Sequence, residues 1–216
     1  MPDSRPSADL LLSTRLGLHA VAEGVLAGPQ HRAAGTIRLS VEPGSVQTVA
    51  EPRLRLGATS VSGPAGEASL LGATSVMALG AAVGVQAGPP VGLYTDTSGV
   101  ELDQPLSIDA DTATALMDFF AVGAAGLLTF APEERAVLWP EHFDLAVTVD
   151  EVNYGVSPGD GFSTQPYAYV GPFRPVADPF FDAPFGAVRT WDQVPDAGGI
   201  AEFFAEGRDR VRAAAG

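Results

Sequence analysis

The 216-residue sequence predicts an α+β fold: a short-stranded, largely antiparallel sheet with about three to four helices. Brief runs of alternating apolar and polar residues, which are typical of half-buried strands, are separated by turns rich in glycine and proline. Other stretches carry apolar residues at helical spacing. With Gly 25 and Pro 18, many connections are expected to be turns. A single α+β domain over residues 1–216 accounts for this, with a subdivision near residue 104 as the alternative.

The first half is expected to begin with a helix from Ser13 to Ala27, in which Leu18, Val21 and Val25 share one stripe. Gly28-Pro29 should end this helix, because proline lacks the backbone N–H that a continuing helix needs. Four short strands and a small-residue helix are then expected, at residues 35–41, 45–50, 53–56, 60–62 and 72–86 respectively.

The second half is expected to hold two clearer helices. Asp109 or Asp111 can cap the first, whose buried face would comprise Leu116, Phe119, Phe120 and Leu127. Asp196 can cap the second, at the C-terminal end of the chain. Between the hairpin described next and this last helix, the loop 178–185 carries three phenylalanines and two aspartates. It either covers a pocket or anchors itself on the sheet.

The stretch 138–172 predicts a hairpin. Residues 139–150 alternate, so Phe143, Leu145 and Val147 should be buried and Thr148 more exposed. Turn residues at 157–161 should reverse the chain into a return strand at 165–170. On the opposite, polar face of the first strand we expect His142, Asp144, Thr148 and Asp150.

This polar face is the candidate site. His142 and Asp144 are two residues apart, a spacing at which a carboxylate could orient an imidazole as a base or metal ligand. The alternative is an ordinary solvated strand face. Candidate catalytic residues are therefore His142, Asp144, Asp150 and Glu151, and candidate ligand-binding residues are Asn153, Tyr154, Tyr167 and Tyr169.

A second pattern concerns metal ligands. His19 and Glu23 lie four residues apart on the predicted first helix, so their side chains should meet. They could supply two ligands to a metal, together with His142 and Asp144, or they could form a simple surface pair. No cofactor follows from the sequence, since it contains neither a Walker loop nor a GxGxxG turn.

Several segments resemble a group of uncharacterised actinobacterial proteins. The resemblance implies a soluble bacterial protein and brings no activity with it. The segments that carry it are LWPEHFD (138–144), VNYGVSPGD (152–160), PYAYVGP (166–172), LHAVAEGVL (18–26) and DPFFDAPFG (178–186).

Composition narrows the partners. A formal charge of −14 disfavours nucleic acid and anionic membranes, which would repel the chain. The absence of cysteine excludes disulfides, thiolate metal sites and cysteine nucleophiles. The longest uncharged span, 68–95, is rich in glycine and alanine and contains two prolines, so no membrane span is expected there. The N-terminal LLL run is too short for a signal peptide. We expect a cytoplasmic protein.

Three function classes remain, and the oligomeric state is not indicated. The first is a protein that binds a small molecule or a partner in a pocket beside the 138–172 hairpin. It is favoured slightly, because the chain has no cysteine or lysine and only three histidines. The second is an enzyme that uses the His142–Asp144 face for metal-assisted or general-base chemistry. The third is a scaffold with the aromatic loop as its contact surface.

Overall fold

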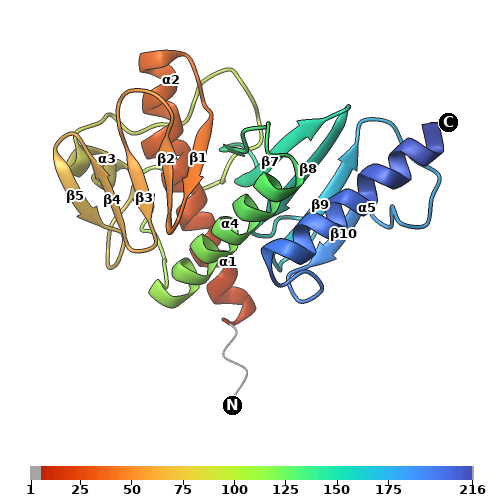
Figure 1. Ribbon diagram of the computed structural model, residues 1–216. Helices are drawn as coiled ribbons and strands as arrows, with labels where there is room; N and C mark the ends of the chain where they lie inside the picture. Colours follow the sequence, from red (N-terminus) through yellow and green to blue (C-terminus); the bar gives the residue numbers. More distant parts are fainter. Residues whose placement is uncertain (1–5, 216) are drawn as a thin grey trace. The chain divides into compact units, whose positions relative to one another are not determined.

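The structure, a computed structural model, describes residues 6–215 and confirms the predicted α+β class with antiparallel strand pairing (Figure 1). Its contacts group the chain into two compact units. The first comprises the residues up to Asp118 together with Leu138–Phe143. The second comprises Phe119–Val137 and Asp144 onward.

The first unit contains a continuous helical segment from Ala8 to Ala34. It consists of α1 (Ala8–Val21), a π-helical turn η1 (Ala22–Ala27) and α2 (Gly28–Ala34). The Ser7 hydroxyl caps its start by accepting the Leu10 N–H, and Gly35, at φ 73°, ends it. The prediction that the helix ends at Gly28-Pro29 is therefore wrong.

The π turn explains how the helix passes Pro29. In η1 the Gly28 N–H bonds to the Glu23 carbonyl, five residues back instead of four. Pro29 then falls in the first turn of α2, where its missing N–H is tolerated. The Gly24 carbonyl is taken up from outside the helix, by the Gly88 N–H at 2.8 Å.

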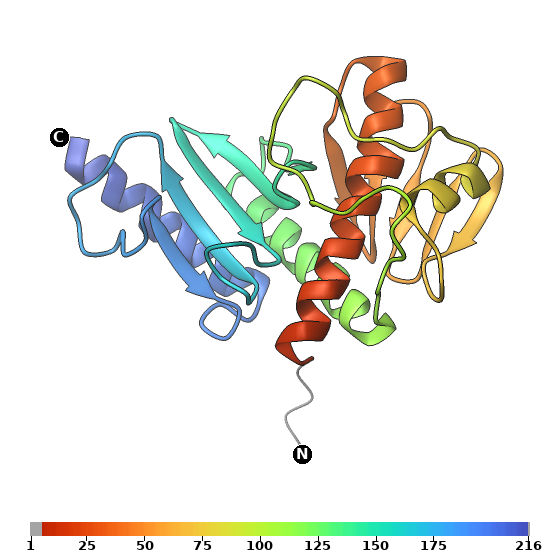
Figure 2. The ribbon, with the colours of Figure 1, turned by 180° about the vertical axis from the view of Figure 1, so that it is seen from behind.

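The sheet of the first unit pairs its strands in the order β6-β1-β2-β3-β4-β5, all antiparallel. One face packs against the helical segment, which lies behind the strands in Figure 1 and in front of them in Figure 2. Val46, Leu56 and Val61 are fully buried on that face and occupy one cross-strand row. The strands are β1 (Leu39–Glu42), β2 (Ser45–Thr48), β3 (Arg55–Gly57), β4 (Ser60–Gly63), β5 (Gly66–Ser69) and β6 (Val137–Trp139).

Two further helices begin in the first unit. The helix α3 (Val76–Val83) is capped by Ser75 and is shorter than the predicted 72–86. The helix α4 (Ala110–Phe130) is capped by Asp109, whose carboxylate accepts the Thr112 N–H at 2.9 Å. That contact decides between the two predicted caps.

The second unit is a four-stranded antiparallel meander in the order β7-β8-β9-β10. Its strands are β7 (Asp144–Val149), β8 (Val152–Ser157), β9 (Tyr167–Pro172) and β10 (Ala187–Thr190). The helix α5 (Ala197–Ala215), capped by Asp196 as predicted, runs along one face of this sheet (Figures 1 and 2). Gly207 of α5 lies against Val170, and Gly123 of α4 lies against Val156.

The predicted hairpin differs from the observed meander. Residues 139–150 do not form one strand: β6 ends at Trp139, residues 140–143 form a turn, and Phe143 has φ 53°. A two-residue turn at Asp150-Glu151, with φ 51° and 61°, leads into β8. Neither this turn nor β8 was predicted from the sequence. The burial expected of Phe143, Leu145 and Val147, and the exposure of Thr148, are nevertheless confirmed.

Two helical stretches, Ala8–Ala34 and Ala110–Phe130, are long and apolar enough to cross a membrane. Much of each is buried inside the protein, 72% and 44% of the apolar window respectively. Core helices meet the same criterion of length and composition, so this is weak evidence for a membrane span.

Replacement of Gly28 tests the close approach at the π turn. A Cβ atom there would lie 1.7 Å from the Gly88 carbonyl oxygen, so the backbone would have to move. We expect Gly28→Ala to lower the free energy of unfolding by roughly 3 kcal/mol or more in urea titrations. Gly161→Ala is the control, because its Cβ would meet nothing within 4 Å. Equal stability of the two variants would contradict this contact.

Replacement of Phe143 tests the turn before β7. Its ring is 1% exposed and stacks on His19, with ring centroids 5.4 Å apart. We expect Phe143→Ala to lower the free energy of unfolding by roughly 3–5 kcal/mol. The control is Phe173→Ala, because that side chain is largely exposed. A loss below about 1 kcal/mol for Phe143→Ala would show that the ring is misplaced.

Candidate functional site

The predicted His142–Asp144 face does not exist as a strand face. His142 lies in the turn before β7, and its side chain is 59% exposed, with Nδ1 3.7 Å from the Asp96 carboxylate. Asp144 is the first residue of β7 and is buried. The positive φ of Phe143 between them breaks the alternation on which the prediction rested.

The two tyrosines of β9 are each bonded to a carboxylate in the second unit. The Tyr169 hydroxyl donates to Asp144 and the Tyr167 hydroxyl donates to Asp160. Gly155, the β8 partner of Tyr169, leaves room for its ring, since a Cβ there would lie 2.6 Å from the ring. The predicted proximity of Tyr169 to Asp144 is therefore present.

Burial is the main reason why both phenol groups resist ionisation. Desolvation raises the pKa of Tyr169 well above its ordinary value, and the Asp144 carboxylate raises it further. Desolvation and the bond to Asp160 act in the same way on the pKa of Tyr167. Both hydroxyls already donate to carboxylates of the same chain, so neither has an O–H donor left for an incoming ligand.

The remaining candidates on this hairpin are dispersed. Tyr154 points to the opposite, helix-covered face, packs on Phe130 and Phe204, and has its pKa raised by burial to about 12. It therefore cannot share a site with Tyr167 and Tyr169. Asn153, Asp150 and Glu151 make contacts near the surface, to Thr148, Arg212 and Arg174 respectively.

The aromatic loop anchors itself through one of its phenylalanines. Phe180 is buried and packs on Phe203 of α5 at 5.5 Å between ring centroids. Phe185 is partly exposed and packs on Phe162 and Tyr169. The loop therefore contributes to the core of the second unit at one end and covers the Tyr169 ring at the other.

His19 and Glu23 are both buried in the first unit and do not form a surface pair. The His19 Nε2–H donates to the Pro140 carbonyl at 2.6 Å. Burial lowers the pKa of His19 from 6.5 to about 4, although that hydrogen bond opposes the change. His19 is thus a neutral core histidine that fixes the 140–143 turn.

Glu23 lies on the π turn, with 4% of its surface exposed. One carboxylate oxygen, Oε2, accepts the N–H and the hydroxyl of Ser98 at 3.2 and 3.1 Å. Burial raises the pKa of Glu23, and hydrogen bonds from Ser98 and Tyr94 offset part of that rise. π turns are frequent at functional sites.

A phenol and a second carboxylate accompany Glu23. The Tyr94 hydroxyl hydrogen-bonds to the Glu23 carboxylate. Its pKa is raised by burial, by the charge of Glu23, by that hydrogen bond and by the charge of Glu141. Glu141 Oε2 is a buried atom that makes no hydrogen bond within residues 6–215. Within residues 6–215, no three His, Asp or Glu side chains are placed to hold one metal ion.

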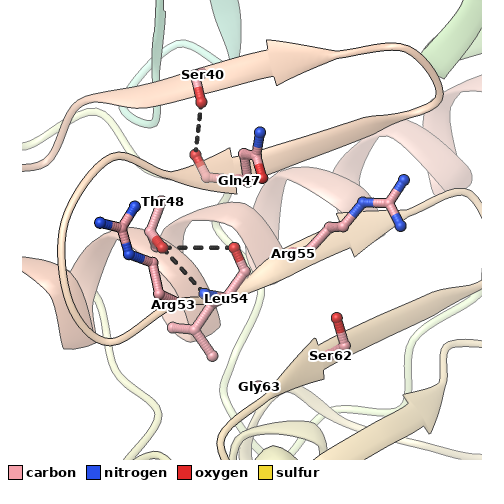
Figure 3. A pocket seen from close by; sticks show the side chains of 8 residues that line it. All are labelled: Ser40, Gln47, Thr48, Arg53, Leu54, Arg55, Ser62 and Gly63. Atoms are coloured by element: carbon pink, nitrogen blue, oxygen red, sulfur yellow. Dashed lines mark hydrogen bonds between the residues drawn. The ribbon is translucent and has the colours of Figure 1, made fainter.

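A cleft of about 350 Å³ lies on the first unit's sheet, among β1, β2, β3 and β4 (Figure 3). Strand pairing places Ser40, Gln47, Arg55 and Ser62 in one row across the face opposite the helical segment. Figure 3 shows the side chains of Arg53 and Arg55 on opposite sides of this cleft. The other lining residues are Thr48, Leu54 and Gly63, so no carboxylate lines it.

The hydrogen bonds in the cleft leave donors available. The Arg55 Nε donates to the Ser45 hydroxyl at 2.9 Å, and within residues 6–215 its two Nη nitrogens make no hydrogen bond. Arg53 pairs with Glu51 at 3.2 Å, with both side chains mostly exposed. Guanidinium, amide and hydroxyl groups in one concave surface suit an oxygen-rich anion.

Comparisons with protein-family models, with curated proteins and with solved structures found no match to this chain. Function is therefore inferred from the chemistry of these sites alone.

Sequence reasoning missed the cleft and the Glu23 cluster. The alternation of Arg53-Leu54-Arg55-Leu56 predicted a strand at 53–56 but no binding surface on it. For the Glu23 cluster the only local signal was His19 and Glu23 at a spacing of four, because Ser98 and Glu141 are far away in the chain.

The His19 environment predicts a specific loss of stability in acid. Because its folded-state pKa is lower than its unfolded value, the stabilisation is complete above pH 6.5 and is lost as pH falls towards 4. The gap corresponds to roughly 3 kcal/mol. Over that pH range His19→Gln, which keeps a donor for Pro140, should lose less stability than the wild type. His142→Gln is the control, and an unchanged pH slope for His19→Gln would contradict the assignment.

Proposed function

We propose that this protein binds a small oxyanion, such as a carboxylate or phosphate group of a metabolite, in the cleft on the first unit's sheet. The observation that carries the proposal is the cleft's lining: two arginines, neutral donors and no carboxylate. The chain as a whole has 26 acidic and 12 basic residues. A cationic concave surface on such a chain is therefore an exception to its average charge.

The proposed function is in the class expected from the sequence, a small-molecule-binding protein. The proposed binding site, however, is the cleft and not a pocket beside the 138–172 hairpin. A pocket beside the 138–172 hairpin has less support, because the hydroxyls of Tyr167 and Tyr169 are already bonded to Asp160 and Asp144. In the cleft, the Nη groups of Arg55 make no hydrogen bond within residues 6–215, and arginine binds oxyanions with paired N–H donors.

The alternative class is an enzyme that uses metal-assisted or general-base chemistry at His142 and Asp144. It has less support, because the turn at Phe143 places one of these residues at the surface and buries the other. A base and its orienting carboxylate would need hydrogen-bond contact.

Titration of the ¹⁵N-labelled protein with succinate and with inorganic phosphate tests the proposal by NMR. We expect the amide resonances of Arg55 and Ser62 to shift and to saturate. The binding affinity should fall as the salt concentration is raised. Arg55→Gln should weaken binding by about tenfold or more, since it removes a charge-assisted contact. The matched control is Arg174→Gln, a mostly exposed arginine of the second unit.

The readout separates binding from general charge effects. Equal binding by Arg55→Gln and the wild type would contradict the proposal. So would shifts at Arg55 and Ser62 that never saturate, or that sodium chloride alone reproduces.

A further inference from the structure

The side chains that flank Arg55 in the cleft are neutral and polar. Strand pairing places Gln47 of β2 and Ser62 of β4 directly opposite Arg55, one on each side (Figure 3). Side chains paired across strands in this way have their Cβ atoms about 5 Å apart. A ligand whose anionic head binds Arg55 therefore lies within reach of an amide on one strand and a hydroxyl on the other.

Both flanking side chains are available to a ligand. They are partly exposed, and within residues 6–215 neither the Gln47 amide nor the Ser62 hydroxyl makes a hydrogen bond. The other hydroxyls of the cleft are already used: Ser40 donates to the Gln47 carbonyl at 3.5 Å, and Thr48 donates to a backbone carbonyl at 2.8 Å. The neutral polar groups left for a ligand are therefore the two next to Arg55.

The cleft has little apolar surface. Among the lining residues that the structure describes, Leu54 is the single apolar side chain, and it is only 2% exposed. Pockets for apolar or aromatic ligands are lined mainly by hydrophobic side chains. The part of the ligand that lies next to its anionic head is therefore expected to be polar.

A carboxylate at the edge of the sheet limits the charge of the ligand. The row of side chains that contains Arg55 and Ser62 continues to Glu67 of β5, which is paired with Ser62 and accepts the Ser60 hydroxyl at 2.5 Å. A second anionic group placed near Ser62 would be repelled by Glu67. A ligand hydroxyl in the same place could donate to it. Glu67 thus favours neutral hydroxyl groups over further charge.

We propose that the ligand of the cleft is a polyhydroxylated anion, such as a sugar acid or a sugar phosphate. Its anionic head binds Arg55, and its hydroxyl groups bind Gln47 and Ser62. An amide and a hydroxyl can each donate and accept, so both side chains can bind a ligand hydroxyl in either sense. This inference rests on the proposed oxyanion site and specifies the class of ligand that the site takes.

Matched ligand pairs test the role of the hydroxyl groups. Gluconate and hexanoate share a carbon chain and a charge, as do sorbitol 6-phosphate and hexyl phosphate, and the members of each pair differ in hydroxyl groups alone. Titrations of ¹⁵N-labelled full-length protein would follow the side-chain amide of Gln47 and the backbone amide of Ser62. We expect the hydroxylated member to bind about tenfold more tightly in at least one pair, and the tighter pair identifies the anionic head.

Two variants assign the hydroxyl contacts. Gln47→Met keeps the length of the side chain and removes its hydrogen-bonding groups, and Ser62→Ala removes the hydroxyl. Each should lower the preference for the hydroxylated ligand by roughly threefold or more and leave the affinity for its alkyl partner unchanged. Arg55→Gln should weaken both members of a pair alike. The matched control is Gln104→Met, an exposed glutamine outside the cleft.

The outcomes separate this inference from the oxyanion site on which it rests. Equal affinities within both ligand pairs would overturn the inference, whereas weaker binding to Arg55→Gln would still support the oxyanion site. A preference that survives in both Gln47→Met and Ser62→Ala would also overturn it, because the hydroxyl groups would then bind elsewhere. Failure of all the ligands to bind would contradict the oxyanion site itself.

Discussion

The hydrogen bond from the Gly88 N–H to the Gly24 carbonyl is the contact on which the first unit depends. Pro29 cannot supply an N–H to the helix, so a carbonyl one turn back would be left unpaired inside the protein. The π turn and Gly88 solve this together. Without these two features, the helix would be expected to end at Gly28-Pro29, as the sequence predicts.

The same contact determines where the buried carboxylate cluster lies. Gly28 allows the Gly88 carbonyl to approach the helix closely, which fixes one end of the segment that then carries Tyr94 and Ser98. The π turn places Glu23 on the buried side of the helix. A backbone irregularity next to one proline thus accompanies a buried carboxylate that is bonded to Ser98.

Residue patterns predicted what depends on neighbours in sequence. Alternation correctly placed Leu145 and Val147 inside and Thr148 outside, and Asp196 was recognised as a cap. The turn at Asp150-Glu151 was missed because both residues adopt positive φ, a conformation that the sequence usually signals with asparagine or glycine.

Contacts distant in sequence could not be predicted. Phe143 also adopts a positive φ, which separates His142 from Asp144 although the letters alternate without a break. Ser98 lies 75 residues beyond Glu23, and no local pattern joins them. The spacing of His19 and Glu23 predicted either two metal ligands or a surface pair, and the surface pair is wrong because both side chains are buried.

Amide hydrogen exchange at Gly88 tests this account most directly. If its N–H is bonded to the Gly24 carbonyl in solution, Gly88 should exchange as slowly as the amides of the helical segment itself, despite lying in an irregular stretch. Exchange at Gly88 as fast as at an exposed position such as Gly92 would contradict the account. The helix would then accommodate Pro29 in another way, and this contact could no longer explain the position of Glu23.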